Sequence, residues 1–131
     1  MKASALRPGW ASDLVVFADD GQVLERDDCL VLRTPGNPTY HWGNCLIVPQ
    51  ALADADLAHW LARFDAEITQ RQPASCHVAI GVNAPWRGEQ LPAWEAAGFT
   101  LFDNAVMALE AGALSEVQEP PRGRVEVRPI R

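Results

Sequence analysis

The sequence has few of the features that mark exported, membrane-spanning or nucleic-acid-binding proteins. Lys2 is its only lysine, and the formal net charge of −6 argues against binding to nucleic acid or to an anionic membrane surface. The stretch MKASALRPGWAS lacks the apolar run of a signal peptide, and no segment approaches the roughly 20 apolar residues of a membrane-spanning helix. These absences predict a cytoplasmic protein with no nucleic-acid or membrane partner.

Cysteine is scarce, and its spacing matches no common disulfide or zinc framework. The chain has three cysteines, an odd number, and none of them forms a CxxC pair, so reduced thiols are predicted. Structural zinc sites have tightly paired ligands, which are absent here, and buried thiols and hydrogen-bonded histidines are the better interpretation. The sequence therefore predicts no metal site, although one can be drawn from Cys29, His41, Cys45, His59, Cys76 and His77.

A catalytic thiol–imidazole pair is a second interpretation of His41 and Cys45. Such a pair needs a base within hydrogen-bond reach of the thiol. In an extended strand the two residues would share a face but lie roughly 13 Å apart. The sequence therefore predicts no catalytic residue here.

The chain does contain enough apolar residues, 48% of 131 positions, to form the core of one compact domain. Residues 10–18 predict a short helix, although two adjacent valines within them also suit a strand. Residues 22–25 and 29–33 predict two short strands. After an irregular Pro- and Gly-rich turn, residues 39–48 predict a strand that returns against the second one.

The second half of the module alternates between helix and strand. Residues 52–70 carry apolar side chains at helical spacing and predict the longest helix. The apolar run 76–82 predicts a central strand, and Pro92 and Gly98 delimit a short helix before a final strand over residues 99–109. This order predicts an α/β (α+β) fold, with a mixed, mostly antiparallel sheet flanked by helices.

The composition changes after Ala113. Residues 114–123 are polar and include adjacent prolines, which predicts a linker. Residues 124–131 alternate apolar and charged side chains as a strand does. The sequence therefore predicts a module over residues 1–113, a linker, and then either the start of a second domain or a free tail strand.

One stretch, RTPGNPTYHWGNCLIVP, is too rich in ring side chains, proline and glycine to be an ordinary core strand. If residues 39–48 are extended, Tyr40, Trp42 and Asn44 share one face and line a cleft, with Trp86 from a later loop nearby. The alternative is a rigid hairpin whose rings fill the core and whose Asn44 satisfies backbone groups of the turn. Trp94 completes the set of candidate cleft residues.

A helix-to-strand motif, WEAAGF, carries a resemblance to a known family. Trp94, Gly98 and Phe99 fall on the pattern Leu-Tyr-x-x-x-Gly-Phe, which is common in the GNAT superfamily of acetyl-CoA-dependent N-acetyltransferases. The segment HVAIGVN is similar to the family's preceding strand and asparagine. TPGNPTYHWGNCLIVP resembles N-terminal regions of two-part GNAT proteins, and VEVRPIR looks like the first strand of a separate GNAT domain.

Two departures from the family bear on activity. GNAT enzymes hold the cofactor pyrophosphate with a Gln/Arg-x-x-Gly-x-Gly/Ala loop at a helix N-terminus, and no such spacing occurs in this chain. The tyrosine that often acts as general acid in the family corresponds to Trp94, whose indole cannot perform that proton transfer. The resemblance therefore implies a GNAT-like module with no catalytic residues and no cofactor of its own, although its parent family uses acetyl-CoA.

Three hypotheses for function follow. The first is the N-terminal, non-catalytic part of a GNAT acetyltransferase, which shapes the substrate side of a cleft or stabilises the catalytic part. Its partner would be a catalytic GNAT domain in the same chain or a second copy of itself. The second hypothesis is a free-standing module that binds a small ligand or a protein, and the third is an autonomous acetyltransferase with an atypical cofactor loop.

Overall fold

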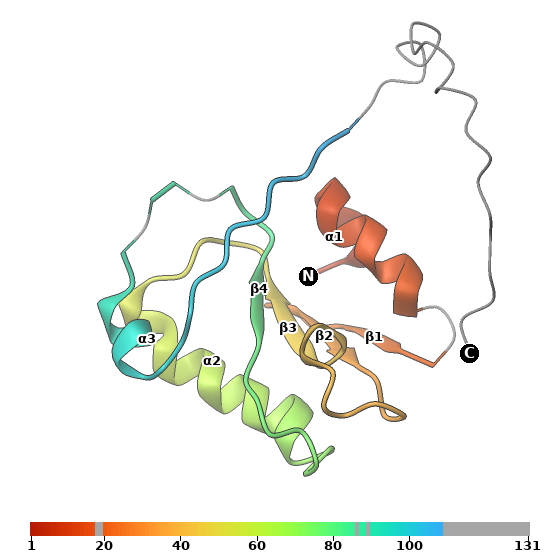
Figure 1. The fold of residues 1–131 in the computed structure, drawn as a ribbon. Coiled ribbons are helices and arrows are strands. Elements are labelled where there is room, and N and C mark those ends of the chain that lie inside the picture. Colours follow the sequence, from red (N-terminus) through yellow and green to blue (C-terminus); the bar gives the residue numbers. More distant parts are fainter. Residues whose placement is uncertain (18–19, 86, 89, 109–131) are drawn as a thin grey trace, which may run out of the picture.

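The computed structural model describes residues 1–17, 20–85, 87–88 and 90–108. Within these residues the centre of the fold is a four-stranded sheet whose spatial order follows the chain (Figure 1). The first strand is antiparallel to the second and the second is antiparallel to the third, whereas the fourth runs parallel to the third. The strands are β1 (Gln22–Glu25), β2 (Leu30–Arg33), β3 (Cys45–Val48) and β4 (Ile80–Val82).

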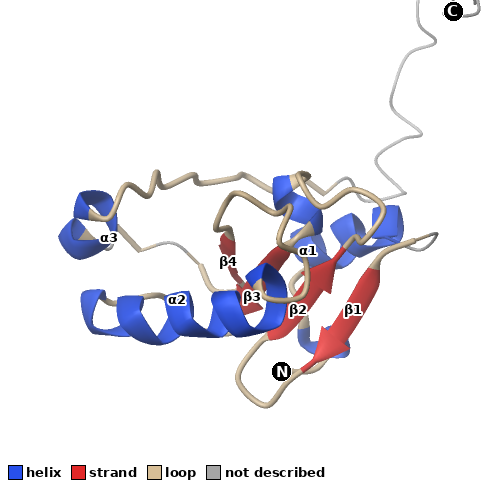
Figure 2. Ribbon diagram, turned by 90° about the horizontal axis from the view of Figure 1, so that it is seen from below, coloured by secondary structure: helices blue, strands red, loops and turns tan. Residues whose placement is uncertain are grey.

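The sheet is flanked by the helices α1 (Pro8–Asp13), α2 (Leu57–Phe64) and α3 (Pro92–Ala96). Figures 1 and 2 show α1 and α2 on opposite faces of the sheet, with α3 beyond one end of α2. The predicted α/β (α+β) fold, a mixed and mostly antiparallel sheet flanked by helices, is confirmed. Short 3-10 turns lie at Ala3–Ala5, Leu14–Phe17, His41–Gly43 and Asp54–Asp56, and a π-helical turn extends α2 over Asp65–Thr69.

The two middle strands are buried on both faces, which explains their continuous apolar sequences. Leu30 and Leu32 of β2 pack with Phe17 on the α1 side. Val31, between them, packs with Phe64 on the α2 side. Because successive side chains of a strand point to opposite faces, each helix finds its own apolar surface to cover.

The predicted strand over residues 39–48 is the first point where the structure differs. Only Cys45–Val48 is extended, and His41–Gly43 form a 3-10 turn instead. The amides of Gly43 and Asn44 donate to the carbonyls of Tyr40 and His41, so the backbone hydrogen bonds of this segment are local. Tyr40, Trp42 and Asn44 therefore do not share one face of a strand.

Two further strand predictions were wrong in part: one strand is shorter than predicted and lies at an edge, and the other does not form over its described residues. Of residues 76–82 only Ile80–Val82 pair with β3, and they lie at the edge of the sheet as described, not at its centre. Residues 99–108 form no strand, although one was predicted over 99–109. They run past β4 without joining the sheet (Figure 1).

The helix predictions are confirmed, with adjusted ends. Residues 10–18 belong to α1 and its 3-10 extension as far as they are described, and the helix predicted over 52–70 spans Asp54–Thr69 with its turns. Helix α3 begins at Pro92, and Gly98 follows it with a φ of 91°. Because side-chain-bearing residues rarely adopt that backbone angle, glycine suits this helix end.

The predicted linker over residues 114–123 and the predicted terminal strand over 124–131 lie outside the described residues, as does the end of the module from residue 109. Within the part of the chain that is described, no helix combines the length and the apolar character needed to cross a bilayer.

An ion pair joins Arg26, in the loop after β1, to Glu67, in the π-helical turn that extends α2. This pair makes the free energy of unfolding sensitive to acid. The buried Glu67 carboxylate accepts from Nε and Nη2 of Arg26 at 2.7 and 3.0 Å. These hydrogen bonds lower the pKa of Glu67 from its ordinary value of 4.5. A lowered folded-state pKa means that the stabilisation is present above the unfolded-state value and is lost as the pH falls through the folded-state value.

We therefore expect Glu67→Gln to reduce the free energy of unfolding by about 2 kcal/mol at pH 7, the usual range for hydrogen bonds to charged groups. The difference from the wild type should shrink as the pH is lowered toward 3. Urea denaturation at several pH values measures it, with the exposed Glu95→Gln as control. If the free energies of unfolding of the wild type and of Glu67→Gln differed by the same amount at every pH, this account would be contradicted.

Candidate functional site

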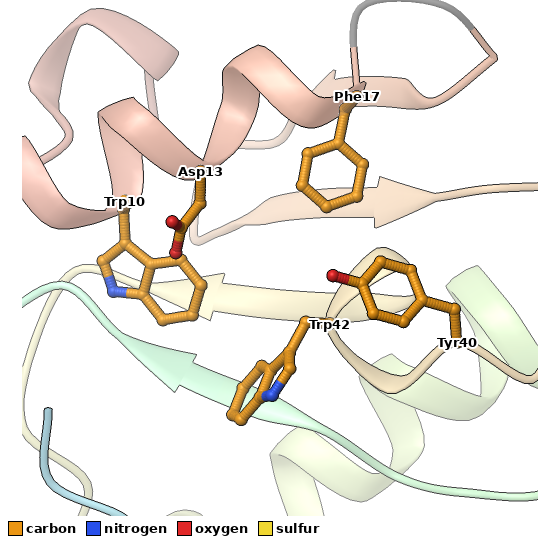
Figure 3. Close-up of a pocket in the computed structure, with 5 residues that line it drawn as sticks. All are labelled: Trp10, Asp13, Phe17, Tyr40 and Trp42. Atoms are coloured by element: carbon orange, nitrogen blue, oxygen red, sulfur yellow. The ribbon is translucent and has the colours of Figure 1, made fainter. Parts of the chain in front are cut away.

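An aromatic pocket lies between α1 with its 3-10 extension and the turn before β3. Its volume is about 240 Å³, and Figure 3 shows the side chains arranged around a common space, with the Tyr40 hydroxyl directed into it. Both Tyr40 and Trp42 keep about two fifths of their surface exposed. The lining residues are Trp10, Asp13, Phe17, Tyr40 and Trp42.

Helix α1 supplies Trp10 and Asp13, and its 3-10 extension supplies Phe17, so the three side chains lie at positions i, i+3 and i+7. Trp10 is fixed because its indole Nε1 donates to the Val82 carbonyl at 3.1 Å. Gly81 makes this approach possible, since a Cβ there would clash with the Trp10 ring. Trp10 then meets Trp42 edge-on, with ring centroids 6.0 Å apart.

Asn44 holds the turn that presents the other two rings. Its side chain is fully buried, and its Oδ1 accepts from the Thr34 amide at 2.9 Å and from Gln72 Nε2 at 2.7 Å. Its Nδ2 donates to the carbonyls of Asn37 and Tyr40, each at 2.9 Å. Asn44 thus satisfies backbone groups of the turn and lines neither hollow of this region.

A larger apolar groove adjoins the aromatic pocket. It has a volume of about 630 Å³ and lies between α1, β4, α3 and residues 99–108. Trp10, Asp13 and Trp42 line both hollows, so the two lie next to each other. Residues 99–108, blue in Figure 1, pass on the open side of β4 and supply one wall of the groove.

Trp94 contributes to the groove while serving as a core residue. It is 2% exposed, its Nε1 donates to the Ala53 carbonyl at 3.0 Å, and its ring meets Phe99 edge-on at 5.1 Å. The side chain therefore joins α3 to the segment before α2. Trp86, the remaining candidate cleft residue, lies outside the described residues.

The start of the α2 helical segment is occupied by the protein's own groups. The Ala53 amide donates to Asp56 Oδ2 at 2.8 Å, and Asp54 Oδ1 accepts from the Ala93 amide at 3.1 Å. Helix N-termini favour anions, but here the Asp56 carboxylate already accepts from the Ala53 amide before α2, and the Asp54 carboxylate accepts from the Ala93 amide in the first turn of α3. An anionic ligand at this end would meet like charge.

The thiols and histidines form no metal-binding cluster in the described part of the chain. All three cysteines are free, as predicted, and no three metal-ligating side chains cluster among the described residues. Burial raises the pKa of Cys29 to about 11 and that of Cys45 to about 12, so both are protonated at neutral pH. His41 and His77 stack with ring centroids 4.3 Å apart, and His77 Nε2 lies 3.1 Å from the Asn44 carbonyl.

Sequence reasoning singled out Tyr40 and Trp42 but missed Trp10, Asp13 and Phe17. The signal was present, because these three residues recur at helical spacing within the predicted helix. What the sequence does not reveal is that this face meets the turn around Trp42 and leaves a hollow there.

Comparison of the chain with protein-family models, with curated proteins and with solved structures found no match. The proposals below therefore depend on the two hollows, on the groups around them and on the resemblance carried by the sequence motifs.

Proposed function

We propose that this chain is a non-catalytic binding module that holds the apolar part of a small molecule in the groove. The observation that carries this proposal is the groove itself. Its volume of about 630 Å³ lies within the roughly 300–1,000 Å³ range of small-molecule sites. Its walls include Trp10, Leu52, Trp94 and Phe99, and such apolar and aromatic lining is typical of ligand pockets.

The GNAT-like assignment remains part of the same proposal. It is supported by the parallel pair β3–β4, which is joined through α2, and by α3, whose Trp94 packs on Phe99 after the turn at Gly98. On this proposal the chain is the cytoplasmic, substrate-side or stabilising module of a two-part GNAT acetyltransferase. A catalytic GNAT domain, or a second copy of the chain, would be its partner.

A lack of acetyl-CoA binding is the first expected result. A pyrophosphate would seek backbone donors at a helix start, but Asp56 already accepts from the Ala53 amide before α2, Asp54 places a second negative charge beside it, and Trp94 bonds to the same segment. Titration calorimetry of the full chain should give a dissociation constant of about 1 mM or weaker, equivalent to about −4 kcal/mol. A micromolar constant, or turnover with amine substrates in a thiol-release assay, would overturn the non-catalytic assignment.

Binding in the groove is tested directly with the neutral fluorescent probe N-phenyl-1-naphthylamine. Its fluorescence should rise on binding to the full chain, and Leu101→Asp should weaken binding at least tenfold by placing a charge in the groove wall. Val78→Asp is the matched control, because Val78 and Leu101 are 40% and 42% exposed and Val78 lines neither hollow. No binding, or equal loss in both variants, would contradict the proposal.

A further inference from the structure

We propose that the aromatic pocket binds a quaternary ammonium group, the cationic end of a ligand whose apolar part lies in the groove. This inference rests on the proposed function for the apolar part, but it adds a second site with its own chemistry. A fully methylated nitrogen has no proton to exchange and no lone pair to accept an acyl group, so the pocket would recognise the group without reacting with it.

The rings around the pocket supply the attraction. Trp10 and Phe17 come from α1 and its 3-10 extension, whereas Tyr40 and Trp42 come from the turn before β3, so rings from two elements surround one space (Figure 3). A cation within about 6 Å of a ring centroid is attracted by the ring quadrupole, most strongly for Trp. The planes of Trp10 and Trp42 are inclined by 61°, so these two rings form a corner and not a closed stack.

Packing leaves two of the rings partly exposed. Trp42 and Tyr40 remain 41% and 42% exposed, whereas core aromatics such as Phe64 and Trp94 are almost fully buried. A hollow of about 240 Å³ remains between them, ample for a trimethylammonium group, which has the shape of a tert-butyl group. Exposed aromatic rings grouped around a hollow indicate a binding surface more than a core.

The charge of the pocket has the sign that a cation requires. Among the described residues that line the pocket, Asp13 is the one with a charged side chain, and none is a lysine or arginine. The whole chain carries a formal charge of −6, which favours approach of a cation from solution.

The described side chains that line the pocket offer few hydrogen-bond acceptors, which favours a methylated cation over a primary ammonium. A primary ammonium carries three donors, and the lining side chains offer it the Asp13 carboxylate and the Tyr40 hydroxyl. A quaternary ammonium needs no acceptor and contacts ring faces through its methyl groups.

The adjacency of the two hollows suggests the rest of the ligand. Trp10, Asp13 and Trp42 line both the aromatic pocket and the groove, so a ligand seated in the pocket lies beside the apolar walls of the groove. The inferred ligand class is therefore a quaternary ammonium compound with an apolar substituent attached.

The test compares choline with its neutral isostere 3,3-dimethylbutan-1-ol, in which carbon replaces the ammonium nitrogen. Binding to the full chain is followed by tryptophan fluorescence and by the indole N–H shifts in NMR spectra. Choline should bind at least tenfold more tightly than the isostere. Equal affinity for the two compounds would overturn the cation proposal.

Two substitutions and a matched control locate the site. Asp13→Asn and Trp42→Leu should each weaken choline binding at least fivefold, and thermal melting confirms that each variant is folded. Asp27→Asn removes the same charge from an exposed loop position outside the pocket and should leave choline binding unchanged. A loss in Asp27→Asn equal to that in Asp13→Asn would indicate general charge attraction and would overturn the proposal.

The neutral probe separates this inference from the proposed function. Probe binding to the groove together with no choline binding overturns the cation site alone, whereas loss of both overturns the binding module as well. In Asp13→Asn the neutral probe should still bind within twofold of the wild type, because the groove keeps its apolar walls. A parallel loss of probe and choline in this variant would contradict a separate role for the aromatic pocket.

Discussion

Replacing Asn44 by alanine is expected to lower the free energy of unfolding by about 4 kcal/mol. The substitution leaves the Thr34 amide and the Gln72 side chain without their acceptor, and the carbonyls of Asn37 and Tyr40 without their donor. An unsatisfied buried polar group costs about 1–3 kcal/mol, and some of these groups regain water when the turn loosens. Urea denaturation followed by far-UV circular dichroism measures the loss.

The control for this prediction is Asn37→Ala, since Asn37 is exposed and its side chain makes a long 3.4 Å contact with Thr39 Oγ1. Its cost should stay below about 0.5 kcal/mol, as is usual for surface positions. Asn44→Asp is informative as well, because it keeps the acceptor and removes the donor. A loss below about 1 kcal/mol for Asn44→Ala would show that the turn does not depend on this side chain.

Replacing Trp94 by alanine is expected to cost about 3–5 kcal/mol, the range for removing a buried aromatic ring. The ring is almost fully buried, and its hydrogen bond to the Ala53 carbonyl joins α3 to the start of the α2 segment. Equilibrium unfolding by urea measures the change, and Trp94→Phe, which keeps most of the apolar volume, should lose less.

Trp42→Ala provides the matched comparison for Trp94→Ala. Because Trp42 is 41% exposed, its removal should cost nearer 1 kcal/mol. Similar losses at the two positions would contradict the distinction between a core tryptophan and a pocket tryptophan.

The sheet and the helices could be predicted where local signals agree. Residues 29–32 and 45–48 are continuous apolar runs because both faces of their strands are covered, and that pattern is visible without the structure. Helix α3 was predictable because Pro92 and Gly98 mark its two ends chemically. Such signals depend on neighbouring residues alone.

The compact turn before β3 was not predictable from its own residues. The sequence pattern predicts an extended strand through residues 39–44, but Asn44 satisfies the backbone of a compact turn from inside. Part of that arrangement depends on Gln72, which lies 28 positions away. A contact at that distance leaves no periodic signal in the sequence.

The aromatic pocket was only half predictable for the same reason. Tyr40 and Trp42 drew attention because rings with a polar handle favour partly wet sites. Trp10 belongs to the pocket because Gly81 and Val82, more than 70 positions later, accept its ring and its indole N–H. Neither residue indicates that partnership by its own type or spacing.

The N-terminal segment is attached to the rest of the fold through contacts between distant positions. The Arg7 amide donates to Asn83 Oδ1 across 76 positions, and Asn83 Nδ2 donates to the Ala5 carbonyl across 78. The hairpins of β1, β2 and β3 close shorter loops, so we expect them to form before these contacts, which join positions 76 and 78 residues apart. We therefore expect the α1 wall of the aromatic pocket to assemble late in folding.

This order of assembly links occupancy of the pocket to the dynamics of the N-terminus. Detachment of residues 1–13 would open the pocket, but it would also uncover the apolar face of β2 and β3 that Met1, Leu6 and Trp10 pack against, so release of a ligand by this route carries the cost of exposing that face. A ligand that binds only the closed form adds its binding free energy to the attachment of this segment. Amide hydrogen exchange in α1 would then slow with ligand concentration, while exchange in β2 and β3 would stay governed by global unfolding.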